Sequence, residues 1–254
     1  MNERLSWHLS QKGIENMKGT ISTIQFNSQL LQHTFSLHVY TPPQYAEGHK
    51  CHLAITQDGL DYFQLGKIAK KMDEAMEKGA RPVIVVGIPY PSIKQRSKWY
   101  APHHDDHIRY MQFLKEELLP FVEQAYETWQ LPHARTLIGD SLAGTISFLT
   151  ALTYPNTFHR VIMQSPYIDA YVLKRVKETD IWNNFELYHT IGTKETAVET
   201  TFGEKMDFLT PNRTLSTLLR NGHARYQYHE FNGTHHWKYW EKDLYNGLQF
   251  MYDF

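Results

Sequence analysis

The 254-residue sequence contains a single cysteine, Cys51, so it cannot form an intramolecular disulfide. One cysteine also excludes a metal site built from several cysteines. Low cysteine usage is typical of reducing compartments. The polar stretch Met1–Lys12 lacks the apolar core of a secretion signal. We therefore expect a cytoplasmic protein.

The sequence also has no excess of positive or of negative residues. Lys and Arg number 26 and Asp and Glu number 27, which gives a net charge of −1. This balance lacks the basic footprint typical of nucleic-acid binding. No apolar run approaches the roughly 20 residues of a membrane-spanning helix. Internal repeats and low-complexity segments are also missing. We expect one domain, residues 1–254, with neither nucleic acid nor a membrane as partner.

What is present is an alternation of apolar strand-like runs with amphipathic segments. The expected strands are Ile21–Phe26, Thr34–Tyr40, Cys51–Thr56, Pro82–Ile88, Arg135–Ile138, Val161–Gln164, Glu186–Ile191 and Arg225–Phe231. The expected helices are Leu65–Lys78, Ile108–Tyr126 with a kink or break at Pro120, Ser141–Thr153, Tyr171–Lys177, Lys205–Asn221 and Trp237–Met251. Tyr90–Asp106 is expected to be a long loop. This order predicts an α/β protein with a mostly parallel sheet, an antiparallel N-terminal edge and helices on both faces.

A serine stands where one of these strands meets a helix. In Gly139-Asp140-Ser141-Leu142-Ala143-Gly144 the small residues would let strand and helix backbones approach closely. This arrangement is typical of a nucleophile elbow, G-x-S-x-G, although Ala143 replaces the last glycine. The alternative is an ordinary turn with a capping serine.

An activated serine needs a base and an acid that orients it, and both should follow later strands. Glu195 follows the strand that ends at Ile191, and we predict that it is the acid. The alternative for Glu195 is a helix N-terminal carboxylate. His235 and His236 follow the last strand, and adjacent side chains cannot both face one pocket. We favour His235 as the base, which gives the chain order serine, acid, histidine.

The oxyanion of an acyl-transfer intermediate requires backbone N–H donors. The N–H of Leu142, directly after the serine, should be one donor. The N–H of Leu60 should be the other, in the turn Asp58-Gly59-Leu60 that follows an early strand. Asp58 is expected to brace this turn by hydrogen bonds.

Several further segments carry a family resemblance that covers about residues 19–250. They are Val39-Tyr40-Thr41-Pro42-Pro43, Gln57-Asp58-Gly59-Leu60, Val85-Val86-Gly87-Ile88-Pro89, Phe113-Leu114-Lys115-Glu116-Glu117-Leu118-Leu119-Pro120-Phe121-Val122, Tyr154-Pro155-Asn156-Thr157-Phe158, Ser165-Pro166 and Gly233-Thr234-His235-His236-Trp237. In this order they resemble the putative-esterase branch of the α/β-hydrolases, which includes esterase D (S-formylglutathione hydrolase), feruloyl esterases, siderophore esterases and mycolyltransferases. The resemblance implies a triad of Ser141, Glu195 and His235 with oxyanion donors at Leu60 and Leu142. It departs at Glu195, where Asp is more usual, and at Ala143.

Two other segments have competing interpretations. The run His103-His104-Asp105-Asp106-His107 has metal-friendly side chains, but consecutive residues rarely converge on one ion, so helix capping by an aspartate is favoured over a metal site. The segment Ser92–Tyr100 is either a solvated loop or a substrate contact. Because related enzymes place substrate contacts there, Arg96 is the residue to test. Trp99 and Tyr62 are further candidates for lining an acyl or aryl pocket.

The sequence therefore predicts a serine carboxylesterase that hydrolyses a small acyl or aryl ester or thioester through an acyl-enzyme and needs no cofactor. An acyltransferase with the same triad and a catalytically silent binding scaffold remain as alternatives. The identity of the ester and the oligomeric state, a homo-oligomer included, stay open.

Overall fold

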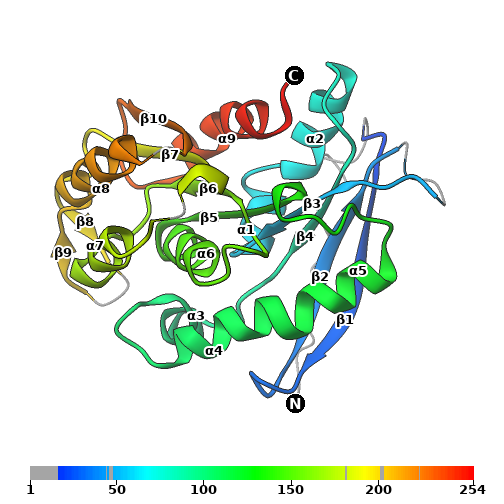
Figure 1. Ribbon diagram of the computed structural model, residues 1–254, viewed down its shortest axis with the longest axis horizontal. Coiled ribbons are helices and arrows are strands. Elements are labelled where there is room, and N and C mark those ends of the chain that lie inside the picture. Colours follow the sequence, from blue (N-terminus) through cyan, green and yellow to red (C-terminus); the bar gives the residue numbers. More distant parts are fainter. Residues whose placement is uncertain (1–16, 44, 46–47, 181, 201–202, 223) are drawn as a thin grey trace, which may run out of the picture.

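The computed structural model describes residues 17–43, 45, 48–180, 182–200, 203–222 and 224–254. Within this part of the chain, the central element is an eight-stranded sheet with strand order β1-β2-β4-β3-β5-β6-β7-β10 (Figure 1). Its strands are β1 (Thr20–Ser28), β2 (His33–Thr41), β3 (His52–Thr56), β4 (Val83–Gly87), β5 (Arg135–Asp140), β6 (Arg160–Gln164), β7 (Glu186–Gly192) and β10 (Arg225–Phe231). The six strands from β4 to β10 pair in parallel, whereas β2 pairs antiparallel with both β1 and β4. The predicted α/β architecture with an antiparallel N-terminal edge is confirmed.

Helices cover both faces of this sheet. The helices α1 (Gly59–Gln64), α2 (Ile68–Glu77) and α9 (Trp237–Tyr252) pack on one face. The other face carries α3 (Ile93–Tyr100), α4 (Asp106–Gln112), α5 (Leu119–Ala125), α6 (Ser141–Thr153), α7 (Ala170–Lys177) and α8 (Leu209–Asn221). Because both faces are covered, β3, β4 and β6 are buried along their whole lengths, which explains the run of at least three apolar residues in each of them.

Two predictions for the N-terminal half are wrong in detail. The expected loop Tyr90–Asp106 contains the helix α3, which begins where the Ser92 hydroxyl accepts a hydrogen bond from the Gln95 N–H (3.1 Å). The expected helix Leu65–Lys78 begins only at Ile68, as α2, and a separate helix, α1, precedes it at Gly59–Gln64. Lys67 adopts a left-handed conformation (φ 53°) between them, and Leu65 is exposed.

Pro120 does not break the helix that contains it. Residues Phe113–Leu118 form a π-helical segment between α4 and α5, and Pro120 lies in the first turn of α5. A proline ring removes one N–H and crowds the carbonyl four residues earlier. The wider π turn before Pro120 accommodates both effects, so the three segments form one long helix in Figure 1.

A short hairpin replaces the start of the last but one predicted helix. Val198–Glu199 (β8) pairs antiparallel with Lys205–Met206 (β9), and α8 begins only at Leu209. The hairpin lies outside the central sheet, and Val198 packs against Ile191 and Phe208. It therefore sits beside the carboxyl end of β7.

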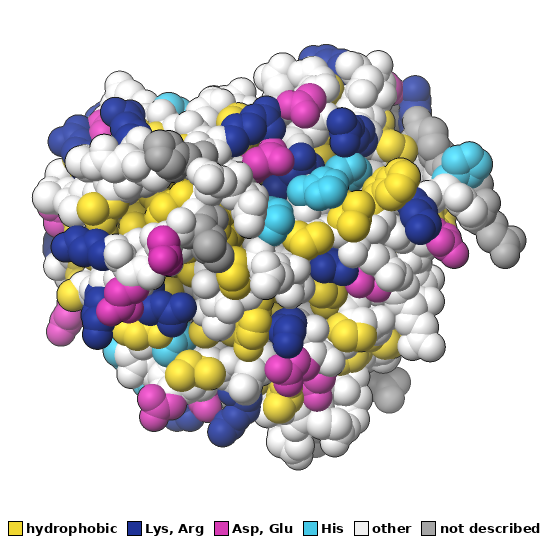
Figure 2. All heavy atoms as spheres, viewed as in Figure 1, with side chains coloured by type: hydrophobic (Ala, Val, Ile, Leu, Met, Phe, Trp, Pro, Cys, Tyr) yellow, Lys and Arg dark blue, Asp and Glu magenta, His cyan; other side chains and the backbone are white. Residues whose placement is uncertain are grey.

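The surface carries mixed charge. Figure 2 shows Lys and Arg side chains interspersed with Asp and Glu side chains over the face in view, as a net charge of −1 would suggest. Among the described residues, no helix has both the length and the apolar character needed to cross a membrane.

Candidate active site

Ser141 lies at the sharp junction between β5 and α6. Its backbone is left-handed, with φ of 50°, which is an uncommon conformation for a residue with a side chain. Gly139 makes the junction possible, because a Cβ on this residue would lie 2.2 Å from the backbone of Ala143. A Cβ on Gly144 would lie 2.9 Å from the Gly139 carbonyl oxygen. Gly144 therefore shares the close contact, and Ala143 is tolerated in the preceding position.

Glu195 is completely buried at the carboxyl end of β7. Its Oε1 atom accepts hydrogen bonds from the Gly192 N–H (2.8 Å) and the Ser165 hydroxyl (2.6 Å). Its Oε2 atom lies 2.6 Å from His235 Nδ1. These contacts leave the carboxylate in one orientation, directed at the histidine ring.

Ser165 comes directly after β6 and also has a left-handed backbone (φ 48°). Its hydroxyl accepts a hydrogen bond from Trp240 Nε1 (3.0 Å), which leaves its own proton to be donated to Glu195. The signal for this residue in the sequence was the Ser165-Pro166 pair, but its contact with the acid could not be read from that pair.

The two adjacent histidines have different surroundings. The His235 ring lies between Phe208 and Trp240, with both ring centroids 4.7 Å away. His236 is the N-cap residue of α9, where its Nδ1 atom accepts a hydrogen bond from the Lys238 N–H (3.0 Å). The structure thus brings His235, and not His236, to Glu195.

The predicted oxyanion turn is fixed by a buried ion pair. Asp58 has φ of 52°, and both of its carboxylate oxygens accept hydrogen bonds from the Arg96 guanidinium. A Cβ on Gly59 would lie 2.2 Å from the backbone of Gly87 and Ile88, so only glycine fits there. The turn carries Leu60 into the first turn of α1. Asp58 therefore braces the loop, as expected.

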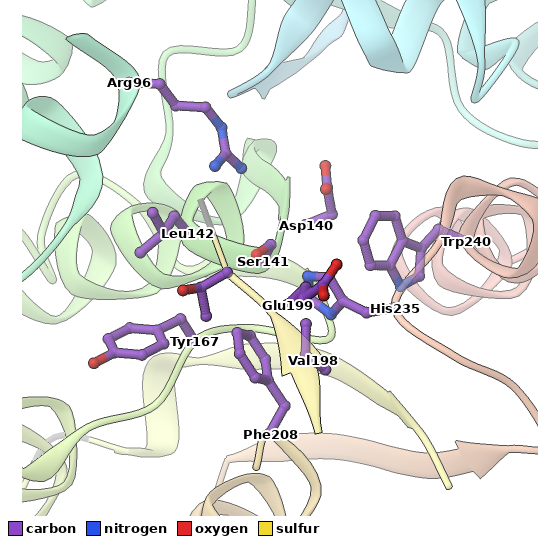
Figure 3. Close-up of a pocket in the computed structure, with 11 residues that line it drawn as sticks. Arg96, Asp140, Ser141, Leu142, Tyr167, Val198, Glu199, Phe208, His235 and Trp240 are labelled. Carbon is purple, nitrogen blue, oxygen red and sulfur yellow. The ribbon is translucent and has the colours of Figure 1, made fainter. Parts of the chain in front are cut away.

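A cavity of about 200 Å³ opens beside Ser141. Its lining residues are Arg96, Asp140, Ser141, Leu142, Tyr167, Val198, Glu199, Thr200, Phe208, His235 and Trp240. Figure 3 shows Arg96 and Asp140 toward one end of this cavity and the rings of Tyr167 and Phe208 toward the other. Ser141 and His235 thus face one shared, partly aromatic space.

The expected substrate-contact residues separate into two groups. The Arg96 side chain reaches the cavity wall while paired with Asp58. Trp99 is buried and packs against Phe35 and Tyr110, and it does not line the cavity. The buried Tyr62 donates its hydroxyl hydrogen to Gln164 (3.1 Å) and is likewise absent from the lining.

The aromatic lining comes instead from later parts of the chain. Tyr167, Phe208 and Trp240 follow β6, β9 and the histidine loop, and β8 adds Val198 and Glu199. These side chains carry no motif of their own in the sequence. Only their positions just beyond strand ends could have indicated them.

The acidic side chains that line the cavity beside Ser141, Asp140 and Glu199, belong to no metal site in the described part of the chain. Among the described residues, no group of three or more His, Cys, Asp or Glu side chains is arranged to hold a metal ion. At the His103–His107 run, Asp105 is the N-cap residue of α4 and Asp106 lies in its first turn, as predicted, although the Asp105 side chain makes no capping hydrogen bond.

Comparison with known proteins places this geometry in a family. The family model described as "Putative esterase" matches residues 28–251. The chain is 43% identical over 226 residues to the Bacillus subtilis (strain 168) protein YjcH, covering 88% of this chain and 93% of that protein.

Solved structures show the same fold at lower sequence identity. A ferulic acid esterase superposes with a TM-score of 0.77 at 18% identity, covering 94% of this chain and 99% of that chain. The enterobactin esterase FES from Shigella flexneri, in the presence of enterobactin, gives a TM-score of 0.78 at 16% identity over 91% of this chain and 58% of that chain. The resemblance predicted from the sequence is thus confirmed. The chain belongs to the "Putative esterase" family and is a carboxylic ester hydrolase with the α/β-hydrolase fold.

Proposed function

We propose that the protein is a serine carboxylesterase in which Ser141 attacks the ester carbonyl. His235 takes the serine proton and later delivers it to the leaving alcohol. Glu195 holds the histidine with the correct nitrogen toward the serine. The observation that carries the proposal is the 2.6 Å contact between Glu195 and His235, whose ring lines one cavity together with Ser141.

Backbone N–H groups would stabilise the negatively charged oxygen that forms when Ser141 attacks the carbonyl. The N–H groups of Leu142, at the start of α6, and of Leu60, at the start of α1, would stabilise the oxyanion. Helix N-termini carry partial positive charge, which favours a developing negative oxygen. Water then hydrolyses the acyl-enzyme on Ser141. Because the chemistry is complete with these groups, no cofactor enters the proposal.

The cavity favours a small acyl or aryl ester. Its volume of about 200 Å³ suits a compact group, and aromatic side chains form one wall. The name of one structural neighbour, a ferulic acid esterase, agrees with esters of aromatic acids as one substrate class. The cytoplasmic location expected from the sequence stays a prediction, which cell fractionation would test.

The test is a set of three variants of the purified protein, assayed with 4-nitrophenyl acetate. Ser141→Ala and His235→Ala should each lower kcat by roughly 10⁴-fold or more, because triad members act as a unit. A fluorophosphonate should label the native protein and not the Ser141→Ala protein. His236→Ala is the matched control and should retain kcat within about threefold. Hydrolysis by Ser141→Ala at the native rate would overturn the proposal.

A further inference from the structure

The amide side chain of Gln164 is fully hydrogen-bonded in the interior behind the candidate active site. Gln164 is the last residue of β6, directly before Ser165, and it is completely buried. Its Nε2 atom donates hydrogen bonds to the Trp240 carbonyl oxygen (2.9 Å) and to Asp243 Oδ2 (2.8 Å). Its Oε1 atom accepts a hydrogen bond from the Tyr62 hydroxyl (3.1 Å). One amide group thus joins β6 to α9 and to α1.

The partners of this amide allow it only one orientation. A carbonyl oxygen and a carboxylate accept hydrogen bonds, so the NH2 group must face Trp240 and Asp243, which leaves Oε1 toward the hydroxyl on α1. Asp243 is held in turn, because its Oδ1 atom accepts a hydrogen bond from Tyr188 (2.7 Å) and lies 2.9 Å from His229 Nε2. A buried polar network with every member bonded is rigid. The Gln164 amide therefore fixes the spacing of α1 and α9.

The α1 end of this connection reaches the predicted oxyanion turn. Tyr62 follows Leu60 by two residues in the same helix, which is only six residues long. Helices this short are not stable by themselves, so the place of α1 depends on its tertiary contacts. The Tyr62 ring packs against Trp237 (centroids 4.8 Å apart), and its hydroxyl bonds the Gln164 amide. The position of the Leu60 N–H therefore depends on Gln164.

The α9 end of the connection reaches the candidate base. The Trp240 ring lies against the His235 ring, with the centroids 4.7 Å apart and the planes nearly perpendicular. Gln164 bonds the backbone carbonyl of this tryptophan, and the next residue, Ser165, bonds its indole nitrogen (3.0 Å). Two adjacent residues at the end of β6 thus hold the aromatic wall on which His235 packs.

We propose that Gln164 is a positioning residue that sets the oxyanion donor of α1 relative to His235, through Tyr62 and Trp240. Gln164 is not among the described residues that line the cavity, so it acts through these neighbours and not on the substrate. Small displacements of preorganised donors and bases lower the rate of the chemical step. This inference rests on the proposed function, because it requires an oxyanion that forms at Ser141.

The first test is Tyr62→Phe, which removes only the hydroxyl that bonds Gln164. With 4-nitrophenyl acetate, kcat should fall by about 5- to 10-fold, the effect of one hydrogen bond. Because an oxyanion forms in both acylation and deacylation, both steps slow together and KM should stay within about twofold. The inhibition constant of methyl trifluoromethyl ketone, which adds to Ser141 to form an oxyanion, should rise by the same factor as kcat falls. Titration with a fluorophosphonate counts the active sites, so that both constants refer to folded enzyme.

Tyr252→Phe is the matched control. Tyr252 is likewise buried, and its hydroxyl donates a hydrogen bond to Thr136 (3.0 Å) near the start of β5, away from Ser141. This variant should lose similar stability in urea but keep kcat and the inhibition constant within about twofold. Equal falls in kcat for Tyr252→Phe and Tyr62→Phe would overturn the proposal, because any lost buried hydrogen bond would then have the same effect. A native kcat in Tyr62→Phe would also overturn it.

A second variant, Gln164→Met, tests whether the tyrosine acts through the amide. Methionine has a similar length and no strong hydrogen bonds, so kcat should fall further than in Tyr62→Phe, because the contact with Trp240 is lost as well. Adding Tyr62→Phe to Gln164→Met should cause no further fall, since the hydroxyl has already lost its partner. If the two effects multiply, the hydroxyl acts independently of Gln164 and the proposal is wrong. If Gln164→Met fails to fold, the comparison of Tyr62→Phe with Tyr252→Phe decides.

The outcomes separate this inference from the proposed function. Ser141-dependent hydrolysis that is insensitive to Tyr62→Phe rejects only the role of Gln164. Hydrolysis that survives Ser141→Ala rejects the serine mechanism, and this inference with it.

Discussion

Ser165 connects the acid of the candidate triad to the aromatic wall of the cavity. Its hydroxyl donates to Glu195 and accepts from Trp240, so one side chain fixes both groups. Residues that hold reacting groups in place contribute to catalysis without touching substrate, because small displacements of those groups are costly. We therefore expect Ser165 to act as a positioning residue in this site.

We expect Ser165→Ala to lower kcat by roughly 10-fold, the size expected for the loss of a hydrogen bond to a charged group, with little change in KM. Steady-state kinetics with 4-nitrophenyl acetate measures both constants. The separation matters, because a general loss of folded protein would lower the apparent kcat in proportion to the folded fraction.

Thr136→Val provides the control for that distinction. Thr136 lies at the opposite end of β5, where its hydroxyl accepts a hydrogen bond from Tyr252 (3.0 Å). This variant also loses a buried hydrogen bond and should lose similar stability, while kcat per folded molecule stays native. If Ser165→Ala and Thr136→Val behave alike in kcat, Ser165 has only a structural role.

At the scale of single residues, the sequence predicted the candidate triad and not its surroundings. Ser141, Glu195 and His235 could be placed because each follows a strand, and parallel strands bring their carboxyl ends to one edge. Tyr62 and Trp99 could not be placed, because an aromatic residue near a strand end packs either into a core or into a cavity. That choice depends on contacts with residues distant in sequence, such as Tyr62 with Gln164.

Among the secondary-structure elements, the junction between β5 and α6 depends strongly on residue size. Gly139 and Ala143 approach so closely that a Cβ at Gly139 would overlap the Ala143 backbone. At Gly144 the contact is looser, with the added Cβ 2.9 Å from the Gly139 carbonyl oxygen. Substitutions at these two glycines therefore test a severe and a milder overlap at the same junction.

Gly139→Ala should destabilise the fold by about 2–3 kcal/mol, because relief of the overlap requires α6 to move away from β5. It should also reduce the rate of fluorophosphonate labelling of Ser141, which begins α6. Gly144→Ala should cost less than about 1 kcal/mol, because a better helix propensity offsets part of its contact. Urea unfolding measures both differences, and equal stabilities of the two variants would contradict the close contact at Gly139.

Elements were predictable where the apolar pattern was long and bounded. The helix Ser141–Thr153 was predicted with the bounds that the structure gives, because a strand and a turn fix its start. The helix α3 was missed, because Pro89 and Pro91 indicate a loop and its sequence has few apolar residues. The hairpin of β8 and β9 was missed because strands of two residues have no detectable period.

Across the whole molecule, buried histidines link stability to pH. His189 is completely buried, with its ring nitrogens 2.9 Å from the Tyr226 hydroxyl and 2.7 Å from Asn212 Oδ1. Burial lowers the pKa of His189 to about 4, despite the opposing hydrogen bond with Asn212. Burial, together with nearby Arg160, Arg81 and His133, also lowers the pKa of His52 to about 4.

The sign of the effect follows from these lowered values. Above pH 6.5, the ordinary pKa of histidine, both residues are neutral in the folded and unfolded chains, so they contribute no pH dependence. Between pH 6.5 and about 4 the unfolded chain binds protons that the folded chain does not, so the free energy of unfolding falls. At pH 5 each residue should account for a loss of about 2 kcal/mol relative to pH 7.

We therefore expect His189→Gln to reduce the pH dependence of stability, because glutamine can keep polar contacts with Tyr226 and Asn212 but does not titrate. The free energy of unfolding is measured in urea at pH 7 and pH 5, and the difference should shrink by about 2 kcal/mol relative to the native protein. Comparison with the native protein removes the contributions of other groups, including Asp140, whose raised pKa acts in the opposite direction. His49→Gln, at an exposed position, should leave the difference unchanged. If His189→Gln and the native protein lose the same free energy between pH 7 and pH 5, burial does not keep His189 neutral in the folded protein.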